Sequence, residues 1–315
     1  MKNASDTLPL RGACDASGGV AIGGGRIAVA DDEHNRVLYY DLAKPGEMPE
    51  TEDWAEALEV SDDAGHPECD LESAAELGGL IYWIGSHSQN KSGKTRRNRH
   101  RLFATRRVGS GRKVRLEFVG GLCKTLREAL VAEEALREFA LAEAAALAPK
   151  LPGGLNIEAI CGTPDGALLI GFRNPVPRGR ALLVPLTNPR ATIEGDAPEF
   201  GAAMVLDLGG LGFRDMVQRG GRYLILAGAI GKTAALAAPS RLFTWEGGAS
   251  VPQPFGEPFA GLNPEALILH DDGARVQMLT DDGACQVDGR ECKDEETPEE
   301  CRSFRSLWVD GWLET

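Results

Sequence analysis

Three glutamates stand two residues after an acidic or amide residue, in Asp70-Leu-Glu72, Asn156-Ile-Glu158 and Asn263-Pro-Glu265. Carboxylate and amide oxygens are the ligands that hard cations such as Ca²⁺ and Mg²⁺ prefer. Three carboxylates that meet in one place cannot all stay ionised without compensation. The motifs therefore point to a site with a bound cation, an arginine or a shared proton, provided that the fold brings them together.

The three motifs belong to a longer repeat that predicts such a fold. Five segments share a polar start, an apolar strand, a glycine turn and a second apolar strand. The third position of these segments is held by Ser17, Glu72, Glu158, Arg214 and Glu265, at intervals of 55, 86, 56 and 51 residues. A third strand follows each pair, at 37–42, 101–105, 181–186, 241–245 and 304–309.

Antiparallel strands that repeat every 50 to 56 residues are typical of a β-propeller. We predict an all-β single domain over residues 1–315, with five blades of four strands and the first residues completing the last blade. A large sandwich or two β domains would give no reason for the periodic motifs.

The 86-residue interval holds one repeat plus an insertion of about 30 residues. Thr125 and Glu128 form a capping box, apolar residues follow at helical spacing, and Pro149 ends the pattern. We predict a helical insertion at about 122–148, within a lid at 120–152 between blades two and three.

Strands in a blade alternate in direction, so the start of the first strand and the end of the second share a face. This face is predicted to hold a metal site made by Glu72, Glu158, Glu265, Asn156 and Asn263. The first interpretation is that these carboxylates bind Ca²⁺ or Mg²⁺. Two other interpretations stay open: a network in which the carboxylates pair with Arg214, and carboxylates that only fasten neighbouring blades.

The same face supplies candidates for proton transfer and for anion binding. His87 and Asp32 are the predicted catalytic residues, because histidine titrates near neutral pH and both follow second strands. A hydrogen-bonding spacer is the alternative role for His87. Guanidinium and amide groups predict substrate binding by Arg173, Asn174, Arg214 and Arg99.

Charge is distributed unevenly along the chain. The formal net charge is −13, yet residues 91–115 carry eleven Lys and Arg and no acid. This stretch could form an anion-binding wall, or a solvated hairpin that pairs with acidic neighbours. Nucleic acid is a disfavoured partner, because the rest of the chain would repel phosphate and only Phe103 is aromatic within the stretch.

Other features exclude several classes of protein. No apolar run is long enough to span a membrane, and the first ten residues lack the apolar core of a signal peptide. Seven scattered cysteines without a CxxC pair favour reduced thiols and a cytoplasmic location over a disulfide framework or zinc site. Motifs of serine hydrolases, zincins and P-loop enzymes do not occur in the sequence.

Several stretches resemble a bacterial family of domains of unknown function. They are Cys69-Asp-Leu-Glu-Ser-Ala-Ala, Trp83-Ile-Gly-Ser-His-Ser-Gln-Asn-Lys, Asn98-Arg-His-Arg-Leu-Phe-Ala-Thr, Pro152-Gly-Gly-Leu-Asn-Ile-Glu-Ala and Leu169-Ile-Gly-Phe-Arg-Asn-Pro. The resemblance implies a propeller fold and no activity. The Asx-x-Glu motifs are also loosely similar to phytase-like and lactonase-like calcium propellers, although Ser17 and Arg214 replace acids at two of the five positions.

Together these features predict a divalent-metal-dependent hydrolase that acts on a small anionic ester or lactone at the axial face. The alternative is a non-catalytic propeller that presents this face to a ligand or a protein partner.

Overall fold

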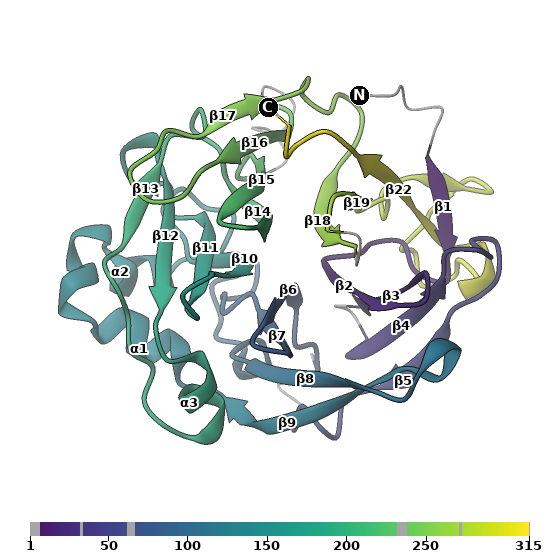
Figure 1. Ribbon diagram of the computed structural model, residues 1–315, viewed down its shortest axis with the longest axis horizontal. Coiled ribbons are helices and arrows are strands. Elements are labelled where there is room, and N and C mark those ends of the chain that lie inside the picture. The colour runs from purple at the N-terminus through teal and green to yellow at the C-terminus, as the bar shows by residue number, and fades with distance from the viewer. Residues whose placement is uncertain (1–6, 32–33, 62–66, 232–237, 271–272, 315) are drawn as a thin grey trace.

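Each repeat of the sequence folds into one four-stranded antiparallel sheet, and the five sheets stand as blades around a central axis (Figure 1). The computed structural model describes residues 7–31, 34–61, 67–231, 238–270 and 273–314. The predicted five-bladed β-propeller is therefore confirmed. No helix among these residues is long and apolar enough to cross a membrane.

The blades follow one another along the chain. Blade one consists of β2 (Gly18–Gly23), β3 (Arg26–Asp31), β4 (Arg36–Asp41) and β5 (Glu50–Asp53). Blade two consists of β6 (Leu71–Leu77), β7 (Leu80–Gly85), β8 (Leu102–Val108) and β9 (Arg115–Cys123). Blade three consists of β10 (Asn156–Gly162), β11 (Leu168–Asn174), β12 (Ala181–Leu186) and β13 (Met204–Leu206). Blade four consists of β14 (Gly212–Arg219), β15 (Arg222–Gly228), β16 (Arg241–Trp245) and β17 (Gln253–Phe255).

Blade five joins the two ends of the chain. It consists of β18 (Pro264–Leu269), β19 (Val276–Thr280), β22 (Ser303–Val309) and β1 (Leu8–Arg11). The N-terminal strand pairs antiparallel with the last one, from Leu8 opposite Ser306 to Arg11 opposite Ser303. This pairing closes the ring, as the sequence predicted.

The core lies between blades, where the faces of neighbouring sheets pack together. Strands β3 and β7 are buried along their whole length because other blades cover both faces of each sheet. Between blades one and two, Trp54 packs edge-on against Trp83, with ring centroids 5.3 Å apart. Such aromatic contacts bury large apolar areas and hold the blades at fixed angles.

The insertion is helical but not one continuous helix. It forms α1 (Leu126–Ala132), a 3₁₀ turn η4 (Glu134–Phe139) and α2 (Leu141–Ala145). Thr125 makes no side-chain capping bond, and Ala140 takes a left-handed conformation. Along this broken path Leu126 and Leu136 both pack against blades two and three.

Short elements occupy other connections. They are η2 (Arg97–Arg99), η3 (Gly111–Lys113), η5 (Pro177–Gly179), α3 (Pro189–Glu194), η6 (Glu299–Cys301) and a hairpin of β20 (Gln286–Val287) and β21 (Arg290–Glu291).

The expectation of reduced thiols throughout the chain was wrong for one pair. A disulfide joins Cys14 to Cys292, which lie 278 residues apart in the sequence. The closed ring brings the two ends of the chain together, and this proximity has no local sequence pattern. The cytoplasmic location stays a prediction, and the disulfide counts against it because disulfides persist mainly in oxidising compartments.

Candidate functional site at the axial pocket

A β-bulge recurs at the same place in four blades. The register shifts between residues 71 and 73 in β6, 157 and 159 in β10, 213 and 215 in β14, and 264 and 266 in β18. The residue passed over is in each case the third position of the repeat: Glu72, Glu158, Arg214 or Glu265. Bulges redirect a side chain and are frequent beside functional sites. The third position of the sequence repeat therefore corresponds to the same β-bulge in four of the five blades.

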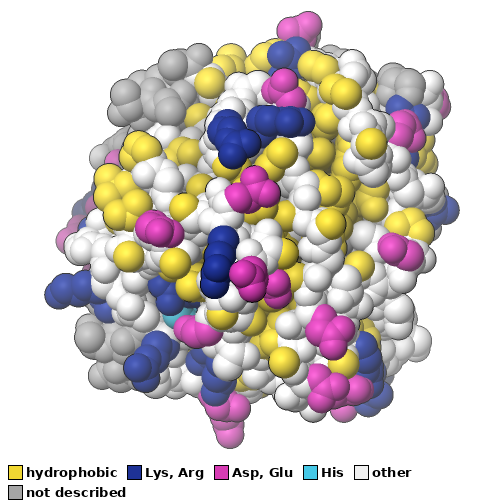
Figure 2. All heavy atoms as spheres, turned by 90° about the vertical axis from the view of Figure 1, so that its left-hand side faces the viewer, with side chains coloured by type: hydrophobic (Ala, Val, Ile, Leu, Met, Phe, Trp, Pro, Cys, Tyr) yellow, Lys and Arg dark blue, Asp and Glu magenta, His cyan; other side chains and the backbone are white. Residues whose placement is uncertain are grey.

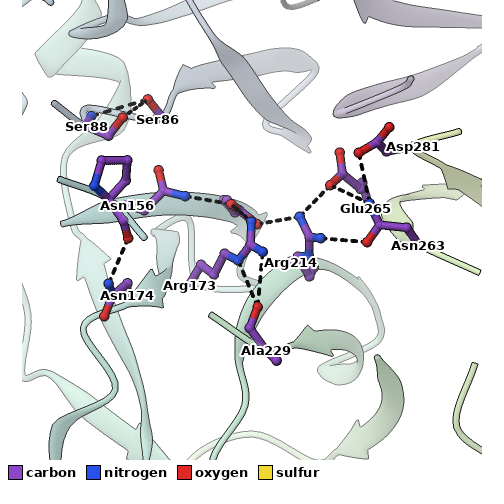
Figure 3. A network of polar contacts seen from close by, with 12 residues as sticks. Ser86, Ser88, Asn156, Arg173, Asn174, Arg214, Ala229, Asn263, Glu265 and Asp281 are labelled. Atoms are coloured by element: carbon purple, nitrogen blue, oxygen red, sulfur yellow. Dashed lines mark hydrogen bonds and ion pairs between the residues drawn. The ribbon is translucent and has the colours of Figure 1, made fainter. Parts of the chain in front are cut away.

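Glu158 accepts bonds from several side chains of a polar network, in which Figure 3 labels Asn156, Arg173 and Arg214. Arg173 Nη1 donates to its Oε1 over 2.6 Å, and Arg214 Nη1 donates to its Oε2 over 3.1 Å. Asn156 Nδ2 also donates to Oε1, over 2.6 Å. A Cβ atom at Gly212 would lie 2.0 Å from the carbonyl oxygen of Arg173. Only glycine therefore allows blades three and four to approach closely enough for both arginines to reach one carboxylate.

Arg214 extends the network to blade five. Its Nη1 donates to Glu265 Oε1 over 2.5 Å, and its Nη2 donates to Asn263 Oδ1 over 2.9 Å. Asn263 Nδ2 in turn donates to Asp281 Oδ2 over 2.9 Å. The structure thus brings Glu158, Glu265 and Arg214 together and corresponds to the arginine-paired alternative of the sequence analysis.

The network shifts the pKa values of Glu158 and Glu265 in opposite directions. Burial alone would raise the pKa of Glu158, but Arg173 and Arg214 outweigh it and hold this pKa below its ordinary value. Burial raises the pKa of Glu265 despite the attraction of Arg214. The carboxylates in turn raise the pKa of Arg214, although burial opposes this, so its guanidinium stays charged.

Glu72 differs from the other two glutamates. No hydrogen bond or ion pair joins its carboxyl to any residue within the described ranges. Burial, followed by repulsion from Glu158, Asp70 and Glu265, raises its pKa well above the ordinary value. Glu72 is therefore a carboxyl group that retains its proton more strongly than an exposed glutamate and has no hydrogen-bond partner among the residues that the structure describes.

A pocket of about 760 Å³ opens over this network. Its floor carries the polar side chains of the inner strands, and its walls come from loops and from the segment after α2. The lining includes Asp15, Ser17, Glu68, Asp70, Glu72, Ser88, Asn90, Lys91, Lys94, Arg96, Arg99, Lys150, Asn156, Glu158, Arg173, Arg214, Glu265, Asp281 and Lys293. The predicted face is thus hollowed and strongly charged, as a ligand site would be.

Sequence reasoning missed a second buried carboxyl beside the axis. Asp215 accepts hydrogen bonds from Ser73 Oγ over 2.8 Å, from the Met216 amide over 2.8 Å and from the Leu267 amide over 2.7 Å. Ser73 Oγ also accepts from the Ile160 amide over 3.0 Å. These bonds link blades two, three, four and five. The available signal was an aspartate directly after the third position of the repeat, beside Phe213 and Met216 in the innermost strand of the blade.

Of the two predicted catalytic residues, the structure describes only His87, which lies outside the pocket. His87 is fully buried, stacks on His100 with ring centroids 5.8 Å apart, and does not line the cavity. Burial, followed by repulsion from His100, lowers its pKa well below the ordinary value. Burial likewise lowers the pKa of His100 to about 4. Asp32 lies outside the described residues.

The predicted substrate-binding residues are held by the protein itself. Arg173 donates from Nε and Nη2 to the carbonyl oxygen of Ala229. Asn174 is fully buried and donates to the carbonyl oxygens of Pro149 and Leu151. It therefore fastens the end of the insertion rather than facing the pocket.

Arg99 lines the pocket but is also paired. It forms ion pairs with Glu68 and, over 2.8 Å, with Asp70. Its Nη1 also donates to Ser88 Oγ over 3.1 Å. These bonds leave little of the guanidinium to bind a ligand.

The basic stretch separates into two parts. Lys91, Lys94 and Arg96 line the pocket, and none of them has an acidic partner in the part of the chain that is described. Further along, four arginines pair with acids of their own or neighbouring blades: Arg106 with Glu117, Arg107 with Glu76, Arg112 with Asp41, and Arg115 with Glu50. On the side of the ring that carries α1 and α3, Figure 2 shows acidic and basic side chains intermixed.

The donor set does not fit a divalent cation. Both oxygens of Glu158 and one oxygen of Glu265 already accept bonds from guanidinium groups. Among the residues that the structure describes, no three His, Cys, Asp or Glu side chains are arranged to hold a metal ion. A cation here would also lie beside the charge of Arg214.

Fold and site together define a five-bladed β-propeller with an arginine-bridged axial pocket. Residues 114–273, just over half of the chain, match the family described as "Protein of unknown function (DUF3616)". The chain belongs to this family. No curated protein sequence matches it.

Solved structures show likeness in fold at low identity. The exo-β-1,3-galactanase of Phanerochaete chrysosporium is 11% identical with a TM-score of 0.46, over 96% of this chain and 60% of that one. The glutaminyl cyclase of Myxococcus xanthus is 11% identical with a TM-score of 0.45, over 97% and 95%. An extracellular domain assigned to a hybrid two-component system of B. thetaiotaomicron is 12% identical with a TM-score of 0.34, over 84% and 24%. This chain thus spans about a quarter of that structure, and the likeness concerns the fold alone.

Proposed function

We propose that this protein hydrolyses a small anionic ester or lactone in the axial pocket, with Glu72 transferring the proton. The observation that carries the proposal is the position of Glu72 in a pocket of about 760 Å³, without a hydrogen-bond partner among the described residues. A carboxyl with a raised pKa can act as a general acid near neutral pH.

The proton passes through Glu72 in both directions. Glu72 donates a proton to the leaving oxygen as water attacks the acyl or phosphoryl centre. The new bond joins water oxygen to that centre, and the bond to the leaving oxygen breaks. The Glu72 carboxylate then regains a proton from the attacking water, so the net change is the addition of one water molecule.

Cationic side chains on the pocket wall favour an anionic substrate. Lys91, Lys94, Lys150 and Arg96 line the cavity and have no acidic partner within the described ranges. Since Arg173 and Arg214 are bound to glutamates, the wall rather than the floor supplies the available positive charge. We propose these four residues as the anion contacts.

The test compares two glutamates on one strand. Glu72→Gln removes the transferable proton, whereas Glu76→Gln removes an exposed carboxyl from the other end of β6. We expect Glu72→Gln to lower turnover of aryl phosphate, aryl acetate or lactone substrates by about 10²- to 10⁴-fold. Glu76→Gln should retain wild-type turnover. Equal turnover in both variants would remove Glu72 from the mechanism.

The sequence also predicts Ca²⁺ or Mg²⁺ with Glu72, Glu158, Glu265, Asn156 and Asn263 as its ligands. This cation has no step in the proposed mechanism, because arginines already bind the oxygens of Glu158 and one oxygen of Glu265. Elemental analysis and thermal melting with and without EDTA test it. A bound metal that is lost in Glu158→Gln would support it, whereas a metal-free protein indifferent to EDTA would contradict it.

A non-catalytic binding propeller is the second candidate. The observation that favours it is that both floor arginines are committed to protein acceptors, which makes the floor a fixed surface. Saturable binding of an anionic ligand without turnover, lost when Lys91 and Lys94 are replaced by alanine, would support this candidate over the hydrolase.

A further inference from the structure

Two cysteines face each other across the β20–β21 hairpin. Gln286 pairs with Glu291, and Val287 pairs with Arg290. One step further from the turn, the Cys292 amide donates to the Cys285 carbonyl oxygen over 2.8 Å. Residues directly opposite in antiparallel strands project to the same face, with Cβ atoms about 4.5–5.5 Å apart. The Cys285 thiol therefore lies on the same face as the Cys292 sulfur.

Cys292 is already bonded to a third cysteine. Its disulfide with Cys14 links the hairpin to the segment between β1 and β2, with the two Cα atoms 5.7 Å apart. A hydrogen-bonded cross-strand pair has a Cα separation of about 5.5 Å, which lies inside the range of about 4.4–6.8 Å that a disulfide needs. The Cα separation thus allows Cys292 to bond either Cys14 or Cys285, and the second bond forms when the Cβ atoms of Cys285 and Cys292 approach to about 3.5–4.5 Å.

We propose that Cys14, Cys285 and Cys292 form a thiol–disulfide exchange site. The Cys285 thiol loses its proton to solvent, and the resulting thiolate attacks Cys292 Sγ. The Cys285–Cys292 bond forms as the Cys14–Cys292 bond breaks, and Cys14 leaves as a thiolate that takes a proton from water. One disulfide and one thiol are present before and after, so the step needs no oxidant or reductant.

The exchange acts on the wall of the axial pocket. Asp15 follows Cys14 and Lys293 follows Cys292, and both of these charged residues line the cavity. In one disulfide state the two wall segments are covalently joined. In the other state the disulfide lies within the hairpin, and the backbone bond from the Asp282 amide to the Cys14 carbonyl oxygen still joins the two wall segments.

Charged neighbours set the pH at which the exchange runs. Burial, followed by the charge of Asp282, raises the pKa of the Cys285 thiol, with a smaller contribution from Asp281. Arg305 acts in the opposite direction. Because only the thiolate attacks, the exchange should be slow at neutral pH and faster in alkaline buffer.

Peptide mapping of the intact, folded protein without added thiol tests the proposal. Samples are held at pH 7 and pH 9, quenched with acid, alkylated and digested under non-reducing conditions. In wild type we expect a Cys285–Cys292 linked peptide that is at least several-fold more abundant at pH 9, with a matching gain of alkylated Cys14. Absence of this peptide at both pH values would overturn the proposal.

Two serine variants make the assignment specific. Cys285→Ser should lose both the new linked peptide and the gain in Cys14 alkylation. Cys301→Ser removes the other exposed free cysteine and should behave as wild type. If Cys14 becomes alkylated equally in Cys285→Ser, or if Cys301 is the residue found linked to Cys292, the proposal fails.

Discussion

Two buried carboxyl groups beside the axis, Glu158 and Asp215, differ in the charge of their partners. Glu158 accepts bonds from two guanidinium groups, and its pKa is lowered. Asp215 accepts bonds from two backbone amides and a serine hydroxyl, and burial raises its pKa to about 8. Both carboxyl groups accept hydrogen bonds, so the difference comes from the guanidinium groups of Arg173 and Arg214, which favour the ionised form of Glu158 at neutral pH.

The two groups should give stability opposite dependences on pH. Glu158 stabilises the fold above its ordinary pKa of 4.5, and this contribution is lost as pH falls through its lower folded pKa. Unfolded Asp215 loses its proton near pH 3.8, whereas the folded group keeps it to about pH 8. Between these values the folded state binds more protons, so the contribution of Asp215 to stability decreases as pH rises.

The largest expected effect comes from removing Glu158. Glu158→Ala leaves Arg173 and Arg214 without their shared partner in a buried site. We expect urea unfolding to show a loss of about 3–5 kcal/mol, because an uncompensated buried charge is costly.

A surface ion pair provides the control for this loss. Glu117→Ala breaks the pair with Arg106, in which both side chains are more than half exposed. Its effect should stay within about 1 kcal/mol. Similar losses in the two variants would mean that the axial network contributes no more than a surface pair.

A smaller effect is expected from Asp215→Asn. The amide cannot accept all three bonds, so we expect a loss of about 1–3 kcal/mol at pH 5. The difference in free energy of unfolding between wild type and variant should narrow toward pH 8. The stability of the wild type decreases as the pH rises toward the pKa of Asp215, whereas an amide does not titrate. Urea titrations at pH 5, 6, 7 and 8 measure the gap. A gap independent of pH would show that the pKa of Asp215 is not raised.

The smallest expected effect on stability comes from Glu72→Gln. Because this carboxyl has no hydrogen bond to another described residue, its loss breaks no protein contact. We expect no loss in the free energy of unfolding at pH 8 and a change toward higher stability, because the raised pKa of Glu72 lowers wild-type stability as the pH rises and an amide does not titrate. Glu76→Gln, which breaks only the surface ion pair with Arg107, serves as the control in thermal melts and should stay within about 1 kcal/mol of wild type. Severe destabilisation of Glu72→Gln would show that Glu72 has a structural partner and is not a free acid.

Much of the fold was predictable from the sequence, because alternating strands and a repeat of about 50 residues leave few ways to bury their apolar faces. The break between α1 and α2 was not predicted, because the apolar spacing indicated one helical insertion at about 122–148. Asp215 was not predicted, because only the third position of each repeat was expected to face the axis, and in this strand that position is Arg214. The Cys14–Cys292 disulfide was missed because ring closure joins residues far apart in sequence.

The sequence by itself determined the five blades and the residue at the third position of each, because strand alternation and periodicity are properties of the chain. It could not choose among a cation, an arginine and a proton as the partner of the carboxylates. Only the tertiary structure shows Arg214 bonded to both Glu158 and Glu265, because the three residues belong to three different blades. Their charges interact only when bulged strands and a close glycine contact bring them within hydrogen-bond distance.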